Sequence, residues 1–195
     1  MLVSGSWLKP KTHSTLLDPG SGIQHLESRI HFGVDILFRV GFGYDAHRLV
    51  EGRPLVLGGV AVPHSRGLLG HSDADVLTHA VIDALLGALC KGDIGQHFPD
   101  TDEAYKNVSS LVLLEKVMTW VREEGYRVGQ VDSTIVAEKP RLGQHIGAMR
   151  DKLCATLGVL PDQVSIKAKT TEKMGFCGRE EGMEAFAVIS LLRRE

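Results

Sequence analysis

The sequence predicts one layered domain of about five β-strands with helices inserted between them, of the α/β or α+β class. Three observations support this. The 195 residues are 43% hydrophobic, enough to bury a substantial core. Short runs rich in Val and Leu, bounded by glycine or proline, alternate with longer segments of helical period. These signals begin abruptly near Arg39, and no sustained period precedes it.

The first expected elements are two strands and a helix. Residues 39–44 and 55–62 are predicted to be strands that form a hairpin or lie beside each other. A helix is predicted to begin at Ser72, because Ser72 and Asp75 have the spacing of a capping box. An apolar stripe at helical spacing then follows: Val76, Leu77, Ala80, Val81, Ala84, Leu85 and Ala88.

The second half continues the alternation. Residues 109–124 are predicted to be a helix that ends at Gly125, and residues 143–157 a helix that ends at Gly158. Strands are expected at residues 126–137, 164–170 and 185–192. Strands and helices mixed in this order predict the layered class.

Residues 1–38 are predicted to be a flexible extension, and residues 39–195 the folded domain. The extension contains Gly20-Ser21-Gly22, prolines and histidines without a regular period. It lacks the basic start and apolar stretch of a secretory signal. We therefore expect a cytoplasmic bacterial protein. A presequence for a plastid-type organelle, a linker from an upstream domain, vector-derived residues and an upstream start codon are the alternative interpretations.

Composition argues against several classes of partner. The formal net charge is -2 and the basic residues are scattered, so neither nucleic acid nor an acidic membrane surface is expected. The apolar stretch of residues 81–90 is short and contains Asp83, which argues against a membrane span and for a soluble protein. The three cysteines have no Cys-x-x-Cys spacing, as is typical of a reducing compartment.

Asp45, His47 and His79 predict a metal site with one open position. Residues i and i+2 of a strand point to the same side, so Asp45 and His47 would lie together at the end of the first strand. His79 would come from the middle of the next helix. Two imidazoles and a carboxylate suit a zinc-type cation at a catalytic site. Alone the pattern is weak, because a histidine on a helix is commonly a hydrogen-bonded core residue.

Two carboxylates lie four residues before and after His79. Asp75 and Asp83 would therefore share its helix face, and they are predicted to orient the ring of this ligand from behind. The alternative interpretation is a solvated polar face with charge pairs between successive turns.

Three segments indicate phosphate chemistry. His71, Ser72 and Asp73 lie at the predicted start of a helix, where free N–H groups favour an anion. Residues 92–95 and 98–102 form a loop rich in glycine, proline and aspartate, although most such loops are simple turns. Residues 169–173 combine lysines, hydroxyls and Glu172 after a predicted strand. That combination suits a nucleoside diphosphate with a second cation on Glu172.

Seven motifs occur in a characteristic order: Arg39-Val-Gly-Phe-Gly-Tyr-Asp-Ala-His, Leu57-Gly-Gly-Val, Gly67-Leu-Leu-Gly-His-Ser-Asp-Ala-Asp-Val, His79-Ala-Val-Ile-Asp-Ala-Leu-Leu-Gly-Ala, Gly92-Asp-Ile-Gly, Phe98-Pro-Asp-Thr-Asp and Lys167-Ala-Lys-Thr-Thr-Glu-Lys-Met-Gly-Phe-Cys-Gly-Arg. From Arg39 to about Arg193 the sequence thereby resembles the 2-C-methyl-D-erythritol 2,4-cyclodiphosphate synthases of the non-mevalonate isoprenoid pathway. The resemblance greatly strengthens the prediction of a metal site.

The resemblance implies a ferredoxin-like subunit, with a mixed β-sheet and helices packed on one face. It also implies a homotrimer with active sites in clefts between neighbouring subunits. The implied substrate is 4-diphosphocytidyl-2-C-methyl-D-erythritol 2-phosphate, and the implied products are the cyclic 2,4-diphosphate and CMP. The 2-phosphate attacks the β-phosphorus within the same molecule, so no protein nucleophile is required.

Roles for the metal-binding and catalytic residues follow from the same resemblance. Asp45, His47 and His79 match zinc ligands, and Glu172 matches a carboxylate that holds Mg²⁺ or Mn²⁺ on the diphosphate. His71 and Thr170 match residues that stabilise the transition state.

The remaining matches concern substrate binding. Those at the methylerythritol phosphate end are Ser72, Asp93, Ile94, Gly95, Phe98, Pro99, Asp100, Thr101 and Asp102. Those at the cytidine end are Ala137, Glu138, Lys139, Pro140, Arg141, Leu142 and Gly143, with Lys169 and Thr171 also assigned to the substrate. Phe176 and Arg179 match positions near the trimer axis, where some members hold an isoprenoid diphosphate.

The sequence departs from the family pattern at a few positions. Lys169 replaces a frequent Thr, Gly143 a frequent apolar residue and Cys177 a frequent Thr. The first two leave the nucleotide contacts open, while the metal ligands are unchanged. Two other functions compete with the synthase. One is a one-zinc phosphodiesterase or phosphatase that uses a metal-bound water. The other is a non-catalytic trimeric protein that binds isoprenoid diphosphates, against which the intact metal trio argues.

Overall fold

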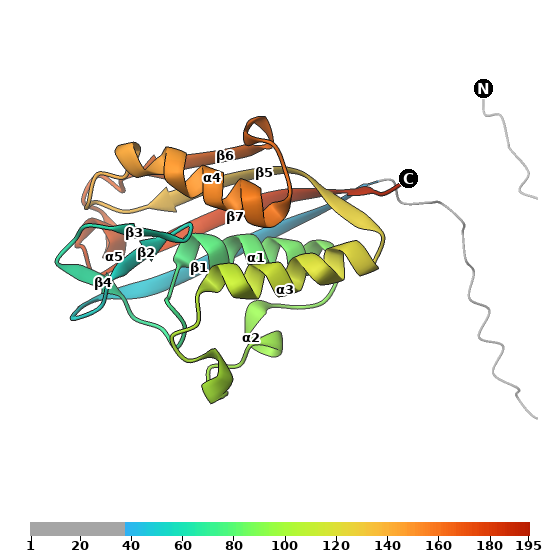
Figure 1. The fold of residues 1–195 in the computed structure, drawn as a ribbon. Coiled ribbons are helices and arrows are strands. Elements are labelled where there is room, and N and C mark those ends of the chain that lie inside the picture. Colours follow the sequence, from blue (N-terminus) through green and yellow to red (C-terminus); the bar gives the residue numbers. More distant parts are fainter. Residues whose placement is uncertain (1–37) are drawn as a thin grey trace, which may run out of the picture. The chain divides into compact units, whose positions relative to one another are not determined.

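The computed structural model describes residues 38–195 (Figure 1). The predicted extension lies outside these residues except for Phe38, which begins the first strand. The elements, in chain order, are β1 (Phe38–Glu51), β2 (Leu55–Leu57), β3 (Val60–Val62), β4 (Arg66–Leu68), α1 (Val76–Ala88), α2 (Ile94–His97), α3 (Ser110–Glu123), β5 (Tyr126–Val136), α4 (Ile146–Leu157), β6 (Val164–Lys169), α5 (Gly175–Gly178) and β7 (Gly182–Arg193). Short 3-10 turns lie at Glu103–Tyr105, Gly143–His145 and Pro161–Gln163.

The main sheet is mixed and has five strands in the order β4-β1-β7-β5-β6. Its pairs are antiparallel except for β5 and β6, which are parallel. The predicted pairing of residues 39–44 with residues 55–62 is wrong. β1 pairs with β7 from Phe38 to Arg48, while residues 55–62 form the separate hairpin β2-β3. Gly58 and Gly59 turn that hairpin with φ of 54° and 70°, the conformation that tight hairpin turns require.

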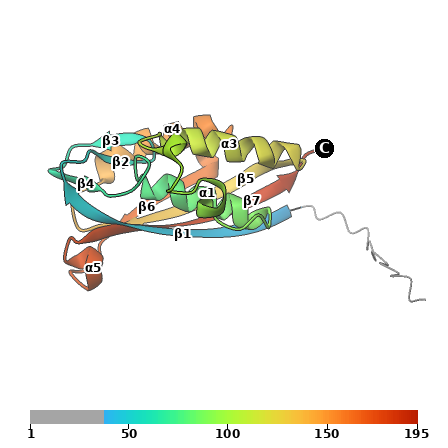
Figure 2. The same ribbon diagram turned by 90° about the horizontal axis from the view of Figure 1, so that it is seen from below.

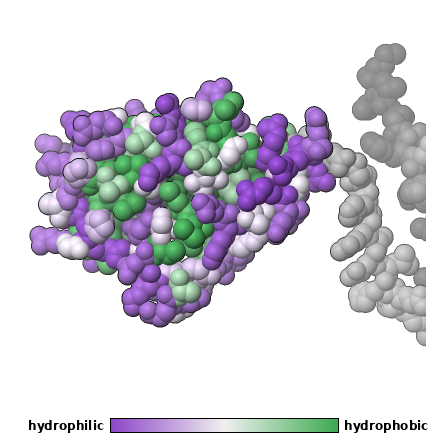
Figure 3. Space-filling model, viewed as in Figure 1, coloured by the Kyte–Doolittle hydropathy of each residue, from purple (hydrophilic) through white to green (hydrophobic). Residues whose placement is uncertain are grey.

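Helices α1, α3 and α4 lie on one side of the sheet, and α5 lies on the other (Figure 2). In the space-filling view of the helical side, hydrophobic side chains show in the middle and hydrophilic ones surround them (Figure 3). α1 is the central helix and is buried nearly all round, as expected of a core helix. Gly41 and Gly43 of β1 leave room for it, because a Cβ at either glycine would overlap a backbone carbonyl of α1. α1 therefore lies directly on β1.

The start of α1 differs from the prediction. The capping residue is Asp75, whose side chain accepts from the backbone N–H of Thr78, and the helix begins at Val76. Ala74 has a φ of 56°, so the chain before Asp75 turns away from helical geometry. His79 consequently lies in the first turn and not in the middle. The two later helices agree with the prediction, and Gly158 ends α4 with a φ of 69°.

The face of the sheet opposite α1 leaves large apolar side chains uncovered. The most exposed are Phe38, Val40 and Phe42 on β1, at 61%, 57% and 62%. Tyr44 and Val188 extend this surface, which we call the apolar sheet face. Among residues 38–195, no helix combines the length and apolar character needed to cross a lipid bilayer.

Candidate active site

The structure brings the three predicted metal ligands together. β1 presents Asp45 and His47 on one side, and the first turn of α1 adds His79. Asp45 Oδ2 lies 3.0 Å from His47 Nε2 and 2.9 Å from His79 Nδ1. The two ring nitrogens are 3.1 Å apart. Three donor atoms from two elements thus converge on one point.

This triangle fits a zinc-type cation. Ligands at ordinary zinc distances stand about 3.3 Å apart along the edges of a tetrahedron, close to the separations of the three donor atoms. Two nitrogens and one carboxylate oxygen form a common zinc donor set, and a three-ligand site keeps a position for substrate.

The electrostatics of the trio favour an ionised aspartate. Burial alone would raise the pKa of Asp45, but hydrogen bonds from His47 and His79 outweigh it and hold this pKa well below its ordinary value. Burial would likewise lower the pKa of His47, but the hydrogen bond and charge of Asp45 outweigh it, so that the pKa is raised. The carboxylate therefore carries a negative charge that attracts a proton or a metal ion to this point.

Each histidine is oriented through its other ring nitrogen. His47 Nδ1 lies 2.7 Å from the carbonyl oxygen of Leu69. Because a carbonyl only accepts, Nδ1 carries a proton. In the neutral imidazole that a metal ion would bind, Nε2 then presents its lone pair to the trio, whereas the protonated ring donates from Nε2 to Asp45. His79 Nε2 lies 2.8 Å from Ser110 Oγ and 3.2 Å from Ser72 Oγ. Outer contacts of this kind fix both the rotation and the tautomer of a ligand.

The structure corrects the predicted role of Asp75 and Asp83. The Asp75 carboxylate accepts from the N–H groups of Gly58, Gly59 and Thr78 and from the Thr78 hydroxyl, and it therefore ties the β2-β3 turn to α1. Asp83 accepts from the N–H of Ile94 at 2.7 Å. The four-residue spacing predicted that Asp75 and Asp83 share the helix face of His79. Their carboxylate oxygens instead accept hydrogen bonds from these N–H and hydroxyl groups. The partner that sequence reasoning missed, Ser110, is separated from His79 by 31 positions and gives no local signal.

A pocket of about 410 Å³ opens beside the metal trio. Seven residues predicted for catalysis or the methylerythritol phosphate end line it: His71, Ser72, Ile94, Gly95, Phe98, Pro99 and Asp100. We call it the metal pocket. Asp93 and Asp102 instead cap the turns on either side, accepting from the N–H groups of Gln96 and Ala104, and Thr101 is exposed between them.

The loop of the metal pocket is anchored to α3. Phe98 stacks on Trp120 with ring centres 5.9 Å apart and meets the edge of Tyr105 at 5.3 Å. His71 Nε2 lies 2.7 Å from the carbonyl oxygen of Asp102 and so donates to it. Aromatic packing and this hydrogen bond hold the loop and His71 together. Trp120 is a supporting residue that sequence reasoning missed.

A second pocket, of about 340 Å³, gathers most of the predicted cytidine residues. We call it the nucleotide pocket. Its lining includes Ala137, Glu138, Pro140, Arg141, Leu142, Gly143, Lys169 and Thr170. Lys139 points elsewhere and pairs with Glu180 at 2.9 Å. The metal pocket is lined by none of these residues.

Glu138 holds the turn that follows β6. Its Oε1 accepts from the N–H groups of Thr171 and Lys173, each at 3.0 Å, and from the Thr171 hydroxyl at 3.3 Å. Glu172 and Lys173 have φ of 51° and 65°, a conformation that is costly for residues other than glycine. Thr170 Oγ1 donates to Glu172 at 2.7 Å. Glu138 was predicted to contact substrate, but its carboxylate is occupied by this turn.

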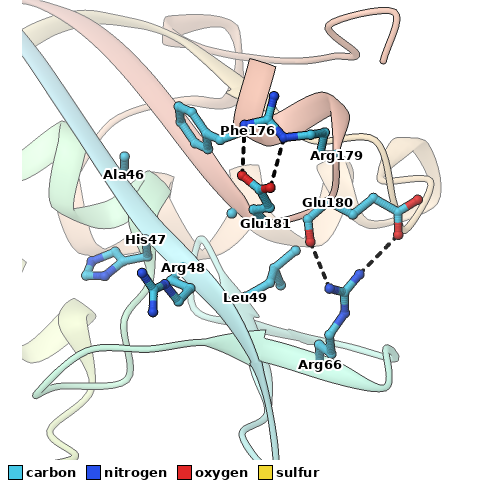
Figure 4. Close-up of a pocket in the computed structure, with 10 residues that line it drawn as sticks. Ala46, His47, Arg48, Leu49, Arg66, Phe176, Arg179, Glu180 and Glu181 are labelled. Atoms are coloured by element: carbon cyan, nitrogen blue, oxygen red, sulfur yellow. Dashed lines mark hydrogen bonds and ion pairs between the residues drawn. The ribbon is translucent and has the colours of Figure 1, made fainter. Parts of the chain in front are cut away.

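Phe176 and Arg179 lie in a third pocket, of about 580 Å³, whose lining also includes His47 of the metal trio (Figure 4). Arg179 donates to both carboxylate oxygens of Glu181, at 2.8 and 3.0 Å. Arg66 donates to the carbonyl and the carboxylate of Glu180, at 2.8 and 3.1 Å. The pocket wall thus combines an aromatic ring with paired charges.

Comparison with known proteins identifies the family that this chain matches. A model of the YgbB family matches residues 38–192. The 2-C-methyl-D-erythritol 2,4-cyclodiphosphate synthase of Bacillus cereus is 53% identical over 158 residues, which are 81% of this chain and 100% of that protein. The synthase of Bacillus anthracis is 52% identical over the same length and coverage.

Solved structures give the same result. The Plasmodium falciparum IspF complex with CDP is 32% identical with a TM-score of 0.71, and the match covers 81% of this chain and 97% of that one. A CDP-bound 2C-methyl-D-erythritol-2,4-cyclodiphosphate synthase is 38% identical with a TM-score of 0.73, over 78% of this chain and 99% of that one. The bifunctional IspDF of Campylobacter jejuni is 40% identical with a TM-score of 0.78; 81% of this chain matches 43% of that protein.

Proposed function

The chain belongs to the YgbB family, and we propose from its geometry how it carries out the reaction of that family. Its curated relatives, matched over their whole length, are cyclodiphosphate synthases. The chain is accordingly an enzyme of the non-mevalonate pathway to isoprenoid precursors, a lyase that acts on a phosphorus–oxygen bond.

The substrate is 4-diphosphocytidyl-2-C-methyl-D-erythritol 2-phosphate. An oxygen of its 2-phosphate bonds to the β-phosphorus, and the bond from that phosphorus to the bridging oxygen of CMP breaks. The products are CMP and 2-C-methyl-D-erythritol 2,4-cyclodiphosphate. Because both reacting groups belong to one molecule, the protein has to position them and offset their charge.

One observation carries this proposal: Asp45, His47 and His79 converge in the wall of a pocket that His71 and Ser72 also line. Zinc held by the trio would polarise a phosphate oxygen at its open position. Glu172, exposed beside Thr170, would hold the Mg²⁺ or Mn²⁺ of the diphosphate. Both ions are part of the proposal.

The chain's own residues position the substrate and stabilise charge. His71, fixed by the Asp102 carbonyl, and Thr170 face the developing negative charge. The anchored loop of the metal pocket, with Ile94, Gly95 and Asp100, binds the methylerythritol phosphate end. Residues 137–143 with Lys169 bind the cytidine end. Two relatives were solved with CDP, which supports a nucleotide at that second pocket.

The complete active site belongs to a homotrimer and lies between neighbouring subunits. Two features support this. The metal pocket and the nucleotide pocket of one chain have separate linings, and the apolar sheet face exposes Phe38, Val40 and Phe42. Exposed apolar patches of this kind commonly mark protein interfaces. A ferredoxin-like subunit is part of the same proposal, supported by a mixed sheet with its long helices on one side.

Two further expectations complete the proposal. The pocket of Phe176 and Arg179 takes an isoprenoid diphosphate. Its aromatic ring would meet the apolar chain, and its arginines, of which Arg66 and Arg179 are paired with Glu180 and Glu181, would meet the diphosphate. The protein acts in the bacterial cytoplasm, as its similarity to bacterial relatives suggests. If residues 1–38 are instead a plastid-type presequence, a fluorescent protein fused behind them will enter that organelle.

Phosphorus NMR of the purified protein with zinc, Mg²⁺ and the cytidyl substrate tests the activity. We expect the cyclic diphosphate and CMP, and we expect His79→Ala to abolish both. Glu115→Ala, at an exposed position of α3 outside the metal and nucleotide pockets, is the control and should retain activity. An open-chain phosphate product would instead establish the hydrolase alternative. Tight binding of isoprenoid diphosphate without any turnover would establish the non-catalytic one.

A further inference from the structure

Two buried residues behind His79 form a connected pair. Ser110 begins α3 and is fully buried, at 0% exposure. Its Oγ lies 2.8 Å from His79 Nε2 and also makes a short hydrogen bond to the carboxylate of Asp73. We propose that Asp73 and Ser110 are positioning residues that set the tautomer and orientation of His79 for metal binding. This inference rests on the proposed metal-dependent function.

The direction of each hydrogen bond follows from which groups can donate. An ionised carboxylate only accepts, so the Ser110 hydroxyl gives its proton to Asp73. The hydroxyl oxygen is then left to accept, and its partner His79 must carry a proton on Nε2. In a neutral imidazole the other nitrogen, Nδ1, then has the free lone pair. Nδ1 is the atom that lies 2.9 Å from Asp45 and 3.1 Å from His47.

Ser72 is a weaker candidate for the same role. Its Oγ lies 3.2 Å from His79 Nε2, longer than the Ser110 contact, and it also accepts from the N–H of Ala74. The Ser72 hydroxyl makes no bond to a carboxylate among the described residues, so the direction of its proton is not fixed. The orientation of His79 therefore depends mainly on Ser110.

Asp73 is itself held in place by α3. It accepts from the backbone N–H of Ser110 at 3.0 Å, and its own N–H donates to the carbonyl of Val108 at 3.0 Å. Ser109, the residue in the capping position, makes no side-chain cap bond. Asp73 thus caps α3 from a different segment. Replacing Asp73 would weaken the helix start as well, whereas Ser110→Ala keeps the N–H that Asp73 binds.

The decisive experiment compares zinc affinities of the full chain and its variants by competition with a chromophoric chelator. We expect Ser110→Ala to bind zinc roughly 10- to 100-fold more weakly than the wild type, as is typical when the outer partner of a ligating histidine is lost. We also expect its cobalt-substituted form to show an altered visible spectrum. Ser109→Ala, an exposed neighbour of the same residue type, is the matched control and should equal the wild type.

Each outcome separates the inference from the function on which it rests. A wild type that binds neither zinc nor cobalt contradicts the proposed function itself. A wild type that binds zinc while Ser110→Ala binds it equally well overturns the inference, as do equal losses in Ser110→Ala and Ser109→Ala. If Ser110→Ala does not fold by circular dichroism, Asp73→Asn replaces it: a weaker zinc affinity supports the inference, and an unchanged one overturns it.

Discussion

The metal pocket and the nucleotide pocket are built in different ways. The metal ligands come from β1 and the core helix α1, and hydrogen bonds to Leu69 and Ser110 fix both histidine rings. The nucleotide pocket lies at the end of β5 and of the edge strand β6, where Lys169 and Glu172 are exposed. The first site is supported by the core, whereas the second is a set of turns at the margin of the sheet.

This difference indicates what each pocket still lacks. The metal pocket has its three candidate ligands, Asp45, His47 and His79, in place within one chain. Beside the nucleotide pocket, the carboxylate of Glu138 helps to hold a strained turn in position. In the proposed trimer, another surface covers this edge pocket. A neighbouring subunit that brings a metal pocket against it would supply that surface.

The largest expected effect comes from mixing two inactive variants. Each active site would combine the metal pocket of one subunit, its metal half, with the nucleotide pocket of a neighbour, its nucleotide half. His79→Ala inactivates the metal half, and Thr170→Ala inactivates the nucleotide half. Equal amounts of the two variant proteins are dissociated and reassembled together. If every site lies between two subunits, each of its two halves has a chance of one half of coming from the variant that leaves it intact. About a quarter of the sites should then be active, which gives about a quarter of wild-type activity. Each variant taken alone through the same procedure should stay inactive. Mixed trimers without any recovery would place both halves in one subunit.

A second prediction changes the packing of α1 on β1, which should affect the metal pocket and not the nucleotide pocket. A Cβ at Gly43 would overlap the carbonyl oxygen of Ala80, so Gly43→Ala must push α1 away from β1 and His79 away from Asp45. We expect a loss of about 1–3 kcal/mol in the free energy of unfolding and weaker zinc binding, with CDP affinity unchanged.

The control for this change is Gly147→Ala on α4. A Cβ at Gly147 would meet nothing within 4 Å, so unfolding, zinc binding and CDP binding should all match the wild type or improve slightly. Calorimetry measures all three quantities. If Gly43→Ala weakened CDP binding as much as zinc binding, the two pockets would not be independent.

A third prediction uses pH. Because Asp45 raises the pKa of His47 above the ordinary 6.5, a proton competes with the metal ion from a higher pH than at a free imidazole. Once the pH falls below this raised pKa, zinc affinity should drop about tenfold per pH unit. CDP affinity, measured over the same range, should lack this midpoint. If the zinc and CDP affinities fell together with the same midpoint, the metal pocket and the nucleotide pocket would not be independent.

Local signals account for the parts of the fold that the sequence predicted. α3 and α4 have helical period and end at glycines, which depend only on neighbouring residues. The strand pairing was mispredicted because the partner of β1 is β7, at the other end of the domain. No local pattern specifies a pairing over that separation. The double glycine at positions 58 and 59 could have revealed the β2-β3 hairpin.

The site shows the same division. Asp45 and His47 could be paired from their spacing alone, because a strand alternates its side chains. Spacing failed for Asp75, which was expected behind His79 but binds the N–H groups of the β2-β3 turn. The true partner, Ser110, depends on how α3 packs beside α1, which is a tertiary feature. Likewise, nothing near Glu138 in sequence predicts its hydrogen bonds to Thr171.

The smallest expected effect tests the support of the nucleotide pocket. Glu138→Gln keeps the shape of the side chain but replaces a charged acceptor with a neutral amide, which weakens the bonds to the N–H groups of Thr171 and Lys173. A change of about 0.5–1.5 kcal/mol should weaken CDP binding roughly two- to tenfold and leave zinc affinity unchanged. Glu123→Gln, exposed at the far end of α3, should alter neither affinity in isothermal titration calorimetry. Because the hydrogen bonds of the Glu138 carboxylate go to the turn and none goes to the metal trio, zinc binding that weakened with CDP binding would show that the two pockets communicate within one chain.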